Sequence, residues 1–194
     1  MALIDIAGRE ICVKIVYYGP GLGGKTTNLR AIHDRLPAAA KNELQSIATV
    51  DERTLFFDFL PLDLGEVDGF TVRVHLATVP GQPRYERTRR TVLNAADGVV
   101  FVADAGRDRL LDNRLSLDEL ARNLTVQGKR LDAIPPFPLV LQYNKTDLPD
   151  AVPTVELDRA LNTLRAPRFE SVAISGVGVV ETLRAIIQLV VRRL

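Results

Sequence analysis

The sequence predicts a single α/β domain in which helices cover both faces of a mostly parallel central sheet, with one antiparallel hairpin at its edge. Strand-like runs rich in Val, Ile, Leu and Phe recur along the chain, and helix-like stretches separate most of them. Such alternation is typical of βαβ units with right-handed crossovers. A chain of 194 residues without a repeat, a low-complexity tract or a linker fits one domain over residues 1–194.

The expected elements follow one another from the first apolar run. The first strand, Ile11–Tyr17, leads into a helix over Thr27–Leu36. The later expected strands are Leu55–Leu60, Phe70–Val79, Gly98–Ala103, Leu139–Tyr143 and Phe169–Ile174. The later expected helices are Arg84–Leu93, Asp108–Gln127, Val155–Leu164 and Val179–Arg193. The apolar residues of the last helix recur at helical spacing and define one buried face.

Two neighbouring strands depart from this alternation. Residues 61–69, between Leu60 and Phe70, show no helical periodicity, which predicts an antiparallel hairpin at the sheet edge. Within Phe70–Val79, apolar residues alternate with Arg73 and His75. One face of this strand should therefore meet solvent.

Composition and charge exclude several classes of protein. Apolar residues at 46% and charged residues at 25% are ordinary for a soluble globular protein, and a net charge of +1 gives no global field for nucleic acid or an anionic membrane. The single cysteine, Cys12, forms no intrachain disulfide, which suits a reducing cytoplasm. The sequence shows no membrane span, signal peptide or lipidation site. We expect a cytoplasmic protein without a direct membrane anchor, which reaches a membrane or cell pole through partners or a surface patch.

A phosphate-binding loop is predicted between the first strand and the first helix. The segment Gly19-Pro20-Gly21-Leu22-Gly23-Gly24-Lys25-Thr26-Thr27 carries the Gly-x4-Gly-Lys-Thr pattern in the strand–loop–helix context that the pattern requires. Its glycines let successive backbone N–H groups point inward as an anion nest, and the helix N-terminus adds partial positive charge. Lys25 would reach the β- and γ-phosphates, and the Thr26 hydroxyl would ligate Mg²⁺. The loop predicts a bound nucleotide without identifying its base.

A second motif, Asn144-Lys145-Thr146-Asp147, follows the expected strand Leu139–Tyr143. Ligands of open α/β sheets bind beyond such carboxyl ends. The Asp147 carboxylate can accept the N1 and exocyclic N–H groups of guanine, whereas adenine would leave it unpaired. The stem of Lys145 can cover the base, and Asn144 can tie the base to the phosphate loop. The two motifs together predict GTP or GDP as the ligand.

Six segments carry a family resemblance: Gly19–Asn28, Asp51–Pro61, Thr78–Gln82, Asp97–Asp104, Gln142–Pro149 and Gly176–Val179. Through them the chain resembles the MglA-like bacterial small GTPases of the Ras superfamily over essentially its whole length. The runs Arg53–Phe59 and Thr78–Gln82 distinguish MglA-like proteins from most Ras relatives. The resemblance implies a P-loop GTPase domain with Mg²⁺ as its metal, slow intrinsic hydrolysis and a role as a molecular switch.

The resemblance also implies roles for single residues. Thr54 matches the threonine that meets Mg²⁺ and the γ-phosphate, Gly81 the glycine whose amide contacts that phosphate, and Gln82 the glutamine that orients the attacking water. Ala173 aligns with the alanine whose N–H reads guanine O6, although Ile174 stands where Ras-like proteins usually have lysine. The expected nucleotide-binding set is Gly19, Gly21, Leu22, Gly23, Gly24, Lys25, Thr26, Thr27, Thr54, Gly81, Asn144, Lys145, Asp147, Ala173 and Ile174, with Thr26 and Thr54 on the metal.

Two positions near the expected γ-phosphate need separate comment. Most Ras relatives have an aspartate where this chain has Thr78, and the sequence assigns no substitute, although Asp58 is a carboxylate on the adjoining strand. Arg53 immediately precedes Thr54, and its residue type alone favours a solvated arginine. The resemblance instead implies that Arg53 is catalytic, an arginine finger acting in cis on the charge that develops during phosphoryl transfer.

The implied partners are a roadblock-domain activating protein of the MglB type and effectors of cell polarity or motility. Basic residues gather after Gln82 at Arg84, Arg87, Arg89 and Arg90. A short basic helix face is usually solvated or meets an acidic partner, so we expect no nucleic acid there.

Two alternative functions share the phosphate loop. A P-loop kinase or ATPase would need a phosphoacceptor pocket and no guanine reader, and ATP would compete equally with GTP. A nucleotide-bound scaffold would keep GTP bound and release negligible phosphate.

Overall fold

One sheet organises the part of the chain that we describe, residues 3–35, 37, 43–47, 57–67 and 69–194 of a computed structural model. Its strands are β1 (Leu3–Asp5), β2 (Glu10–Tyr18), β3 (Gln45–Ile47), β4 (Phe57–Val67), β5 (Phe70–Thr78), β6 (Gly98–Asp104), β7 (Leu139–Asn144) and β8 (Arg168–Ser171). The order across the sheet is β3-β4-β5-β2-β6-β7-β8, and β1 pairs with β2. The pairs β5–β2–β6–β7–β8 are parallel, whereas β1–β2, β3–β4 and β4–β5 are antiparallel.

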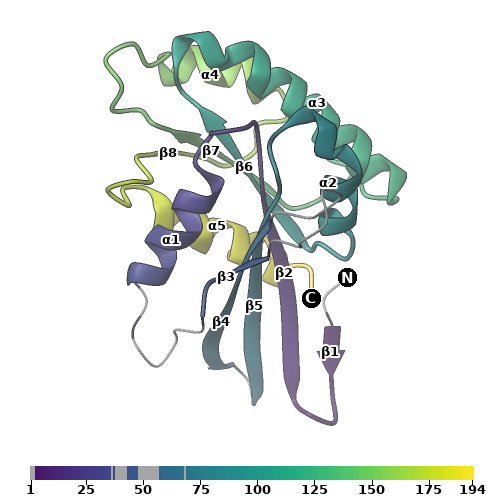
Figure 1. The fold of residues 1–194 in the computed structure, drawn as a ribbon. Coiled ribbons are helices and arrows are strands. Elements are labelled where there is room, and N and C mark those ends of the chain that lie inside the picture. Colours follow the sequence, from purple (N-terminus) through teal and green to yellow (C-terminus); the bar gives the residue numbers. More distant parts are fainter. Residues whose placement is uncertain (1–2, 36, 38–42, 48–56, 68) are drawn as a thin grey trace.

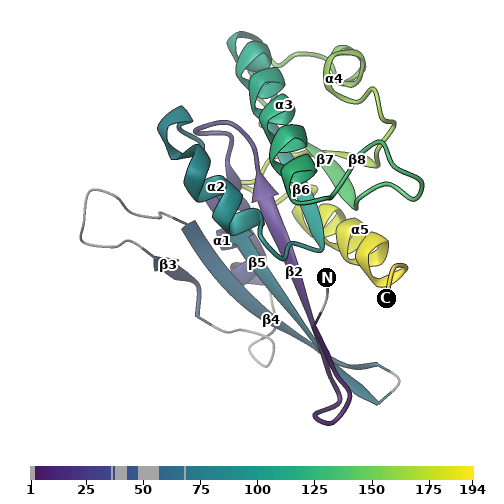
Figure 2. The ribbon, with the colours of Figure 1, turned by 90° about the vertical axis from the view of Figure 1, so that its right-hand side faces the viewer.

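Helices cover both faces of this sheet, as Figures 1 and 2 show. They are α1 (Lys25–Arg35), α2 (Glu86–Leu93), α3 (Leu110–Val126), α4 (Thr154–Leu161) and α5 (Val179–Val191), with 3₁₀ turns at Pro83–Tyr85 and Arg107–Arg109. Buried residues of α1 and α5 pack in one core with alternate residues of the strands. Those of α2, α3 and α4 form the second core on the opposite face. The expected fold class is confirmed.

The hairpin of β4 and β5 is confirmed as antiparallel, but its outer strand is longer than expected. β4 continues to Val67 through residues expected to form a loop, with a register irregularity between Asp63 and Glu66. Buried Leu60 and Leu62 continue the strand's alternation, and Gly65 has a φ of 83° within the irregular stretch. Proline and glycine in the sequence hid this continuation, because both residues are depleted in strands. The short strand β3 lies outside β4, pairing with Phe57–Phe59.

Other boundaries differ by a few residues. β8 ends at Ser171 rather than Ile174, because the chain turns back and Val172 pairs with Val177 in an isolated bridge. α4 ends at Leu161 rather than Leu164, where the Asn162 side chain exchanges hydrogen bonds with Ala166. The three-residue strands β1 and β3 were not expected, because they are too short for a visible alternation. No described helix has the length and apolar character to cross a bilayer.

The lower parts of β2, β4 and β5 project beyond the helices in Figures 1 and 2. On β2, Cys12 is partly exposed, with its Sγ 3.3 Å from Nδ1 of His75 on β5. The His75 ring also meets Phe59 edge-on, at a centroid distance of 5.1 Å. Burial, together with Arg73 and Lys14, lowers the pKa of His75, although Glu10 raises it.

Candidate functional site

The predicted binding residues gather where the parallel strands end. The phosphate loop follows β2, Asp104 ends β6, and Asn144 ends β7. Three loops far apart in sequence therefore meet at the carboxyl ends of neighbouring strands. The chain crosses from one side of β2 to the other between β5 and β6, and open α/β sheets bind ligands at such switch points.

Gly24 of the phosphate loop could not be replaced by another residue without rearrangement of its surroundings. Gly24 has a φ of 100°, and a Cβ there would lie 2.2 Å from Nδ2 of Asn144. The backbone N–H of Asn28 donates to the Gly24 carbonyl at 2.9 Å, which starts α1 directly after the loop. The loop therefore leads into a helix N-terminus whose orphan N–H groups can face an anion.

Lys25 lies folded against the loop, with 7% of its surface exposed. Its ammonium donates to the carbonyl oxygens of Gly19 at 3.0 Å and Pro20 at 2.6 Å. Burial, assisted by the positive charge of Arg89 and opposed by Asp58, lowers the pKa of Lys25 to about 8. A desolvated cation of this kind interacts with phosphate more strongly than one in water.

Beside the phosphate loop, two threonine hydroxyls of the described residues meet one carboxylate. Thr26 Oγ1 donates to Asp58 Oδ2 at 2.5 Å, and Thr78 Oγ1 donates to the same oxygen at 3.0 Å. The Asp58 backbone N–H in turn donates to Thr78 Oγ1 at 2.8 Å. Thr78 therefore holds a carboxylate from β4 beside Thr26 instead of supplying one from β5.

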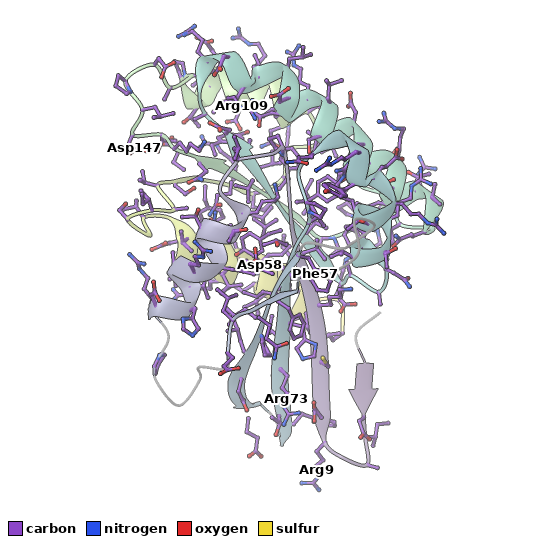
Figure 3. The ribbon with its side chains drawn as sticks, viewed as in Figure 1. Arg9, Phe57, Asp58, Arg73, Arg109 and Asp147 are labelled. Atoms are coloured by element: carbon purple, nitrogen blue, oxygen red, sulfur yellow. The ribbon has the colours of Figure 1, made fainter. Side chains whose placement is uncertain are left out.

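The Asn-Lys-x-Asp motif is joined to the phosphate loop by one side chain. Asn144 Nδ2 donates to the Gly23 carbonyl at 2.9 Å. Its Oδ1 accepts from Ser171 Oγ at 3.1 Å and from the Ala173 N–H at 2.9 Å. Asp147 is exposed at the same end of the molecule as Arg109, as Figure 3 shows. Because Asn144 engages the Ala173 amide, that amide could also read guanine O6 only by sharing its hydrogen.

Lys145 has a left-handed φ of 64°, and its ammonium lies 2.5 Å from Asp104 Oδ2. Arg109 lies 3.7 Å from the same carboxylate oxygen and donates to the Gly21 carbonyl at 2.8 Å. These contacts link the Asn-Lys-x-Asp motif to the phosphate loop a second time. We assigned no role to Asp104 or Arg109 from the sequence. The position of Asp104 at the end of an apolar strand was the available signal.

The residues predicted to surround the γ-phosphate, including the predicted catalytic residues Gln82 and Arg53, are only partly within the described structure. Gly81 lies against the phosphate loop, since a Cβ built on it would lie 2.3 Å from the Gly21 nitrogen and 2.6 Å from the Pro20 carbonyl carbon. Gln82 is exposed and precedes the 3₁₀ turn. Arg53 and Thr54 lie outside the described residues. Leu22 and Ile174 are 87% exposed, so they can contribute backbone groups but little packing in this arrangement.

The sequence predicted that the basic residues after Gln82 would be solvated or would meet an acidic partner, and they divide between solvent and acidic residues of the same chain. Arg84 and Arg87 are exposed, and Arg90 pairs with Glu86 at 2.6 Å. Arg89, by contrast, is 3% exposed and pairs with Glu119. Arg89 is not solvated, because helix phase turns it toward α3, where its acidic partner Glu119 lies within the same chain.

Comparison with models of known protein families found no match. The chain is 51% identical over 194 residues to the mutual gliding-motility protein MglA of Myxococcus xanthus (strain DK1622), covering 100% of this chain and 98% of the relative. The chain belongs to the MglA family of small GTPases. Membership of the MglA family confirms the resemblance seen in the motifs and implies that the ligand is a guanine nucleotide.

Proposed function

We propose that this chain is a GTP-dependent molecular switch that hydrolyses GTP to GDP, slowly until an activating partner binds. The observation that carries the proposal is the hydrogen bond between Asn144 and the Gly23 carbonyl. It fixes the base-reading motif relative to the phosphate loop, as a ligand with a guanine at one end and phosphates at the other requires.

Mg²⁺ fits the oxygen donors beside the phosphate loop. Mg²⁺ prefers hard oxygen ligands and retains several waters. We propose that the Thr26 hydroxyl binds the metal directly, together with Thr54, and that Asp58 holds a metal-bound water in place of the missing aspartate at Thr78. The contact of Asp58 with both threonine hydroxyls supports this assignment. Bound Mg²⁺ would neutralise charge on the β- and γ-phosphate oxygens.

In the proposed hydrolysis, four residues act on the phosphates or on the attacking water. Lys25 holds the β- and γ-phosphates, the Gly81 N–H holds a γ-phosphate oxygen, and Gln82 orients the attacking water. Arg53 acts as an arginine finger in cis, and such a group contributes about 10³–10⁵ in rate. The family's name-giving relative is a gliding-motility protein. We extend the proposal to polarity or motility control through a roadblock-type activating protein and effectors.

The deciding experiment measures binding and turnover separately. Purified protein should bind GTP and GDP but not ATP in competition titrations, and it should release phosphate from bound GTP in a single-turnover assay. Equal competition by ATP would favour a kinase or ATPase, and GTP that stays bound without phosphate release, activating partner included, would favour a scaffold. Arg53→Ala should bind GTP normally and hydrolyse it more slowly than wild type.

A further inference from the structure

Arg89 on α2 is a buried charge with an unusually complete set of partners. Its Nε and Nη2 donate to the two oxygens of Glu119 on α3 at 2.6 and 2.8 Å. Its Nη1 donates to the carbonyl oxygens of Pro80 at 3.0 Å and Gln82 at 2.5 Å. A buried charge is tolerated only when it is paired and hydrogen-bonded, and the planar guanidinium suits this bidentate arrangement.

The carboxylate that receives Arg89 is itself fixed from the phosphate-loop side. Tyr18, the last residue of β2, donates its hydroxyl to Glu119 Oε1 at 2.9 Å. Asn123 Nδ2 donates to Glu119 Oε1 at 3.2 Å and to the Tyr18 hydroxyl at 3.3 Å. We call Arg89, Glu119, Tyr18 and Asn123 the Arg89 network. It connects the end of β2 through α3 and α2 to the segment Pro80–Gln82.

The two carbonyls that Arg89 holds flank Gly81. A trans peptide is planar, so its C=O and N–H point in opposite directions. Holding the Pro80 carbonyl therefore fixes the direction of the Gly81 N–H, and holding the Gln82 carbonyl fixes the backbone from which the Gln82 side chain begins. Gly81 already lies against Gly21 of the phosphate loop.

We propose that Arg89 is a positioning residue for GTP hydrolysis: it aims the Gly81 N–H and the Gln82 backbone at the γ-phosphate, with Glu119 and Tyr18 holding it in place. This inference rests on the function proposed above. Arg89 touches neither nucleotide nor water in this role. This positioning raises the affinity for nucleotides that carry a γ-phosphate and the rate of the chemical step. It does not change the affinity for GDP.

Arg89→Lys tests this role, because lysine keeps the charge but cannot bridge two carbonyls and a carboxylate at once. The readouts on full-length protein are melting temperature, GDP affinity, affinity for a non-hydrolysable GTP analogue, and single-turnover GTP hydrolysis. We expect GDP affinity within about twofold of wild type. The affinity ratio of analogue to GDP should fall about fivefold, and the hydrolysis rate at least about tenfold, as expected for loss of hydrogen-bonded positioning. Arg87→Lys, an exposed neighbour on the same helix, should match wild type.

Glu119→Gln provides a second variant in case Arg89→Lys does not fold. It keeps the side-chain shape but removes the charge, and the same two quantities should fall by a smaller factor while GDP affinity stays. Wild-type ratios and rates in either folded variant overturn the proposal. A parallel loss of GDP affinity, analogue affinity and melting temperature also overturns it, because that pattern indicates a purely structural role. A wild-type protein that hydrolyses no GTP refutes the proposed function, whereas the analogue-to-GDP ratio still tests the positioning of Gly81.

Discussion

The Asp58 carboxylate oxygen accepts hydrogen bonds from Thr26 and from Thr78, at 2.5 and 3.0 Å. In most Ras relatives a carboxylate in this role would come from the position of Thr78. Here Thr78 donates to the carboxylate of Asp58 on the neighbouring strand, and we propose that Asp58 takes this role. Such an exchange would preserve the proposed metal chemistry while changing the sequence motif that normally identifies it.

The first prediction concerns this carboxylate. Asp58→Asn should weaken Mg²⁺-dependent retention of GDP, since loss of a group that holds a metal-bound water or ligand typically costs about 10–100-fold in metal affinity. The measurement is the GDP dissociation rate with Mg²⁺ and with a chelator. The two rates should converge in the variant and differ in the wild type. Asp63→Asn, on the same strand, is the control; an unchanged Mg²⁺ dependence in Asp58→Asn would rule out the assignment.

A second prediction concerns the base. Asp147→Asn should reduce GTP affinity by about 10–150-fold, the equivalent of hydrogen bonds to a charged group, and should improve binding of xanthosine triphosphate. Competition titrations with the two nucleotides measure this exchange. Asp150→Asn, also exposed and three residues further along, should leave both affinities unchanged. Unchanged GTP affinity in Asp147→Asn would refute the base-reading role.

The connection between β5 and α2 is built to approach the phosphate loop closely. β5 ends at Thr78, and Gly81 then passes over Pro20 and Gly21 before the 3₁₀ turn begins at Pro83. Arg89 holds the carbonyls on both sides of Gly81. The segment therefore has little room for an added side chain.

Gly81→Ala tests this approach. Its Cβ would lie 2.3 to 2.6 Å from backbone atoms of Gly21 and Pro20, and backbone cannot move aside cheaply. The variant should bind GDP but hydrolyse GTP at least about tenfold more slowly, a loss of ~1.4 kcal/mol in transition-state stabilisation. Gly8→Ala, whose nearest neighbour is the exposed Asp5 side chain, is the control for single-turnover rates. A normal rate in Gly81→Ala would show that the segment moves away before hydrolysis.

The helices and longer strands could be predicted because their periodicity is local. β4 was predicted too short, because Pro61 and Gly65 interrupt the pattern while the partner strand β5 continues to pair with it. The contact between Thr26 and Asp58 was not predictable either, since it depends on how α1 packs beside the hairpin. Arg89 was interpreted from its charged neighbours in sequence, whereas its partner Glu119 lies on another helix.

Over the whole molecule, the sheet joins a helix-covered half that carries the predicted nucleotide site to a projecting half formed by the lower parts of β2, β4 and β5 (Figure 1). Within the sheet, Cys12 of β2 contacts His75 of β5. The nucleotide motifs could be found from sequence because each follows an apolar strand. The pairing of Cys12 with His75 could not, because it depends on the register of β2 against β5.

His75 makes the free energy of unfolding depend on pH. Burial lowers the folded pKa of His75 below its unfolded value, with Arg73 and Lys14 acting in the same direction and Glu10 against it. The unfolded chain therefore binds the proton first, and the free energy of unfolding falls as the pH drops below about 6.5 toward the folded pKa. Urea denaturation between about pH 8 and pH 5 measures this slope. His75→Gln should reduce it; an equal slope in both proteins would contradict the prediction.

The three hydrogen bonds of Asn144 have a consequence for how a nucleotide leaves. Asn144 contacts the phosphate loop at Gly23, the end of β8 at Ser171 and the following loop at Ala173. The predicted base-binding and phosphate-binding parts of the site are therefore joined through one side chain. Binding of either part of the nucleotide raises the effective concentration of the other part. We expect a substitution at Asp147 to change which base the protein binds. A substitution at Asn144 would instead separate binding of the base from binding of the phosphates. Each part of the nucleotide would then be released separately, and dissociation would be faster.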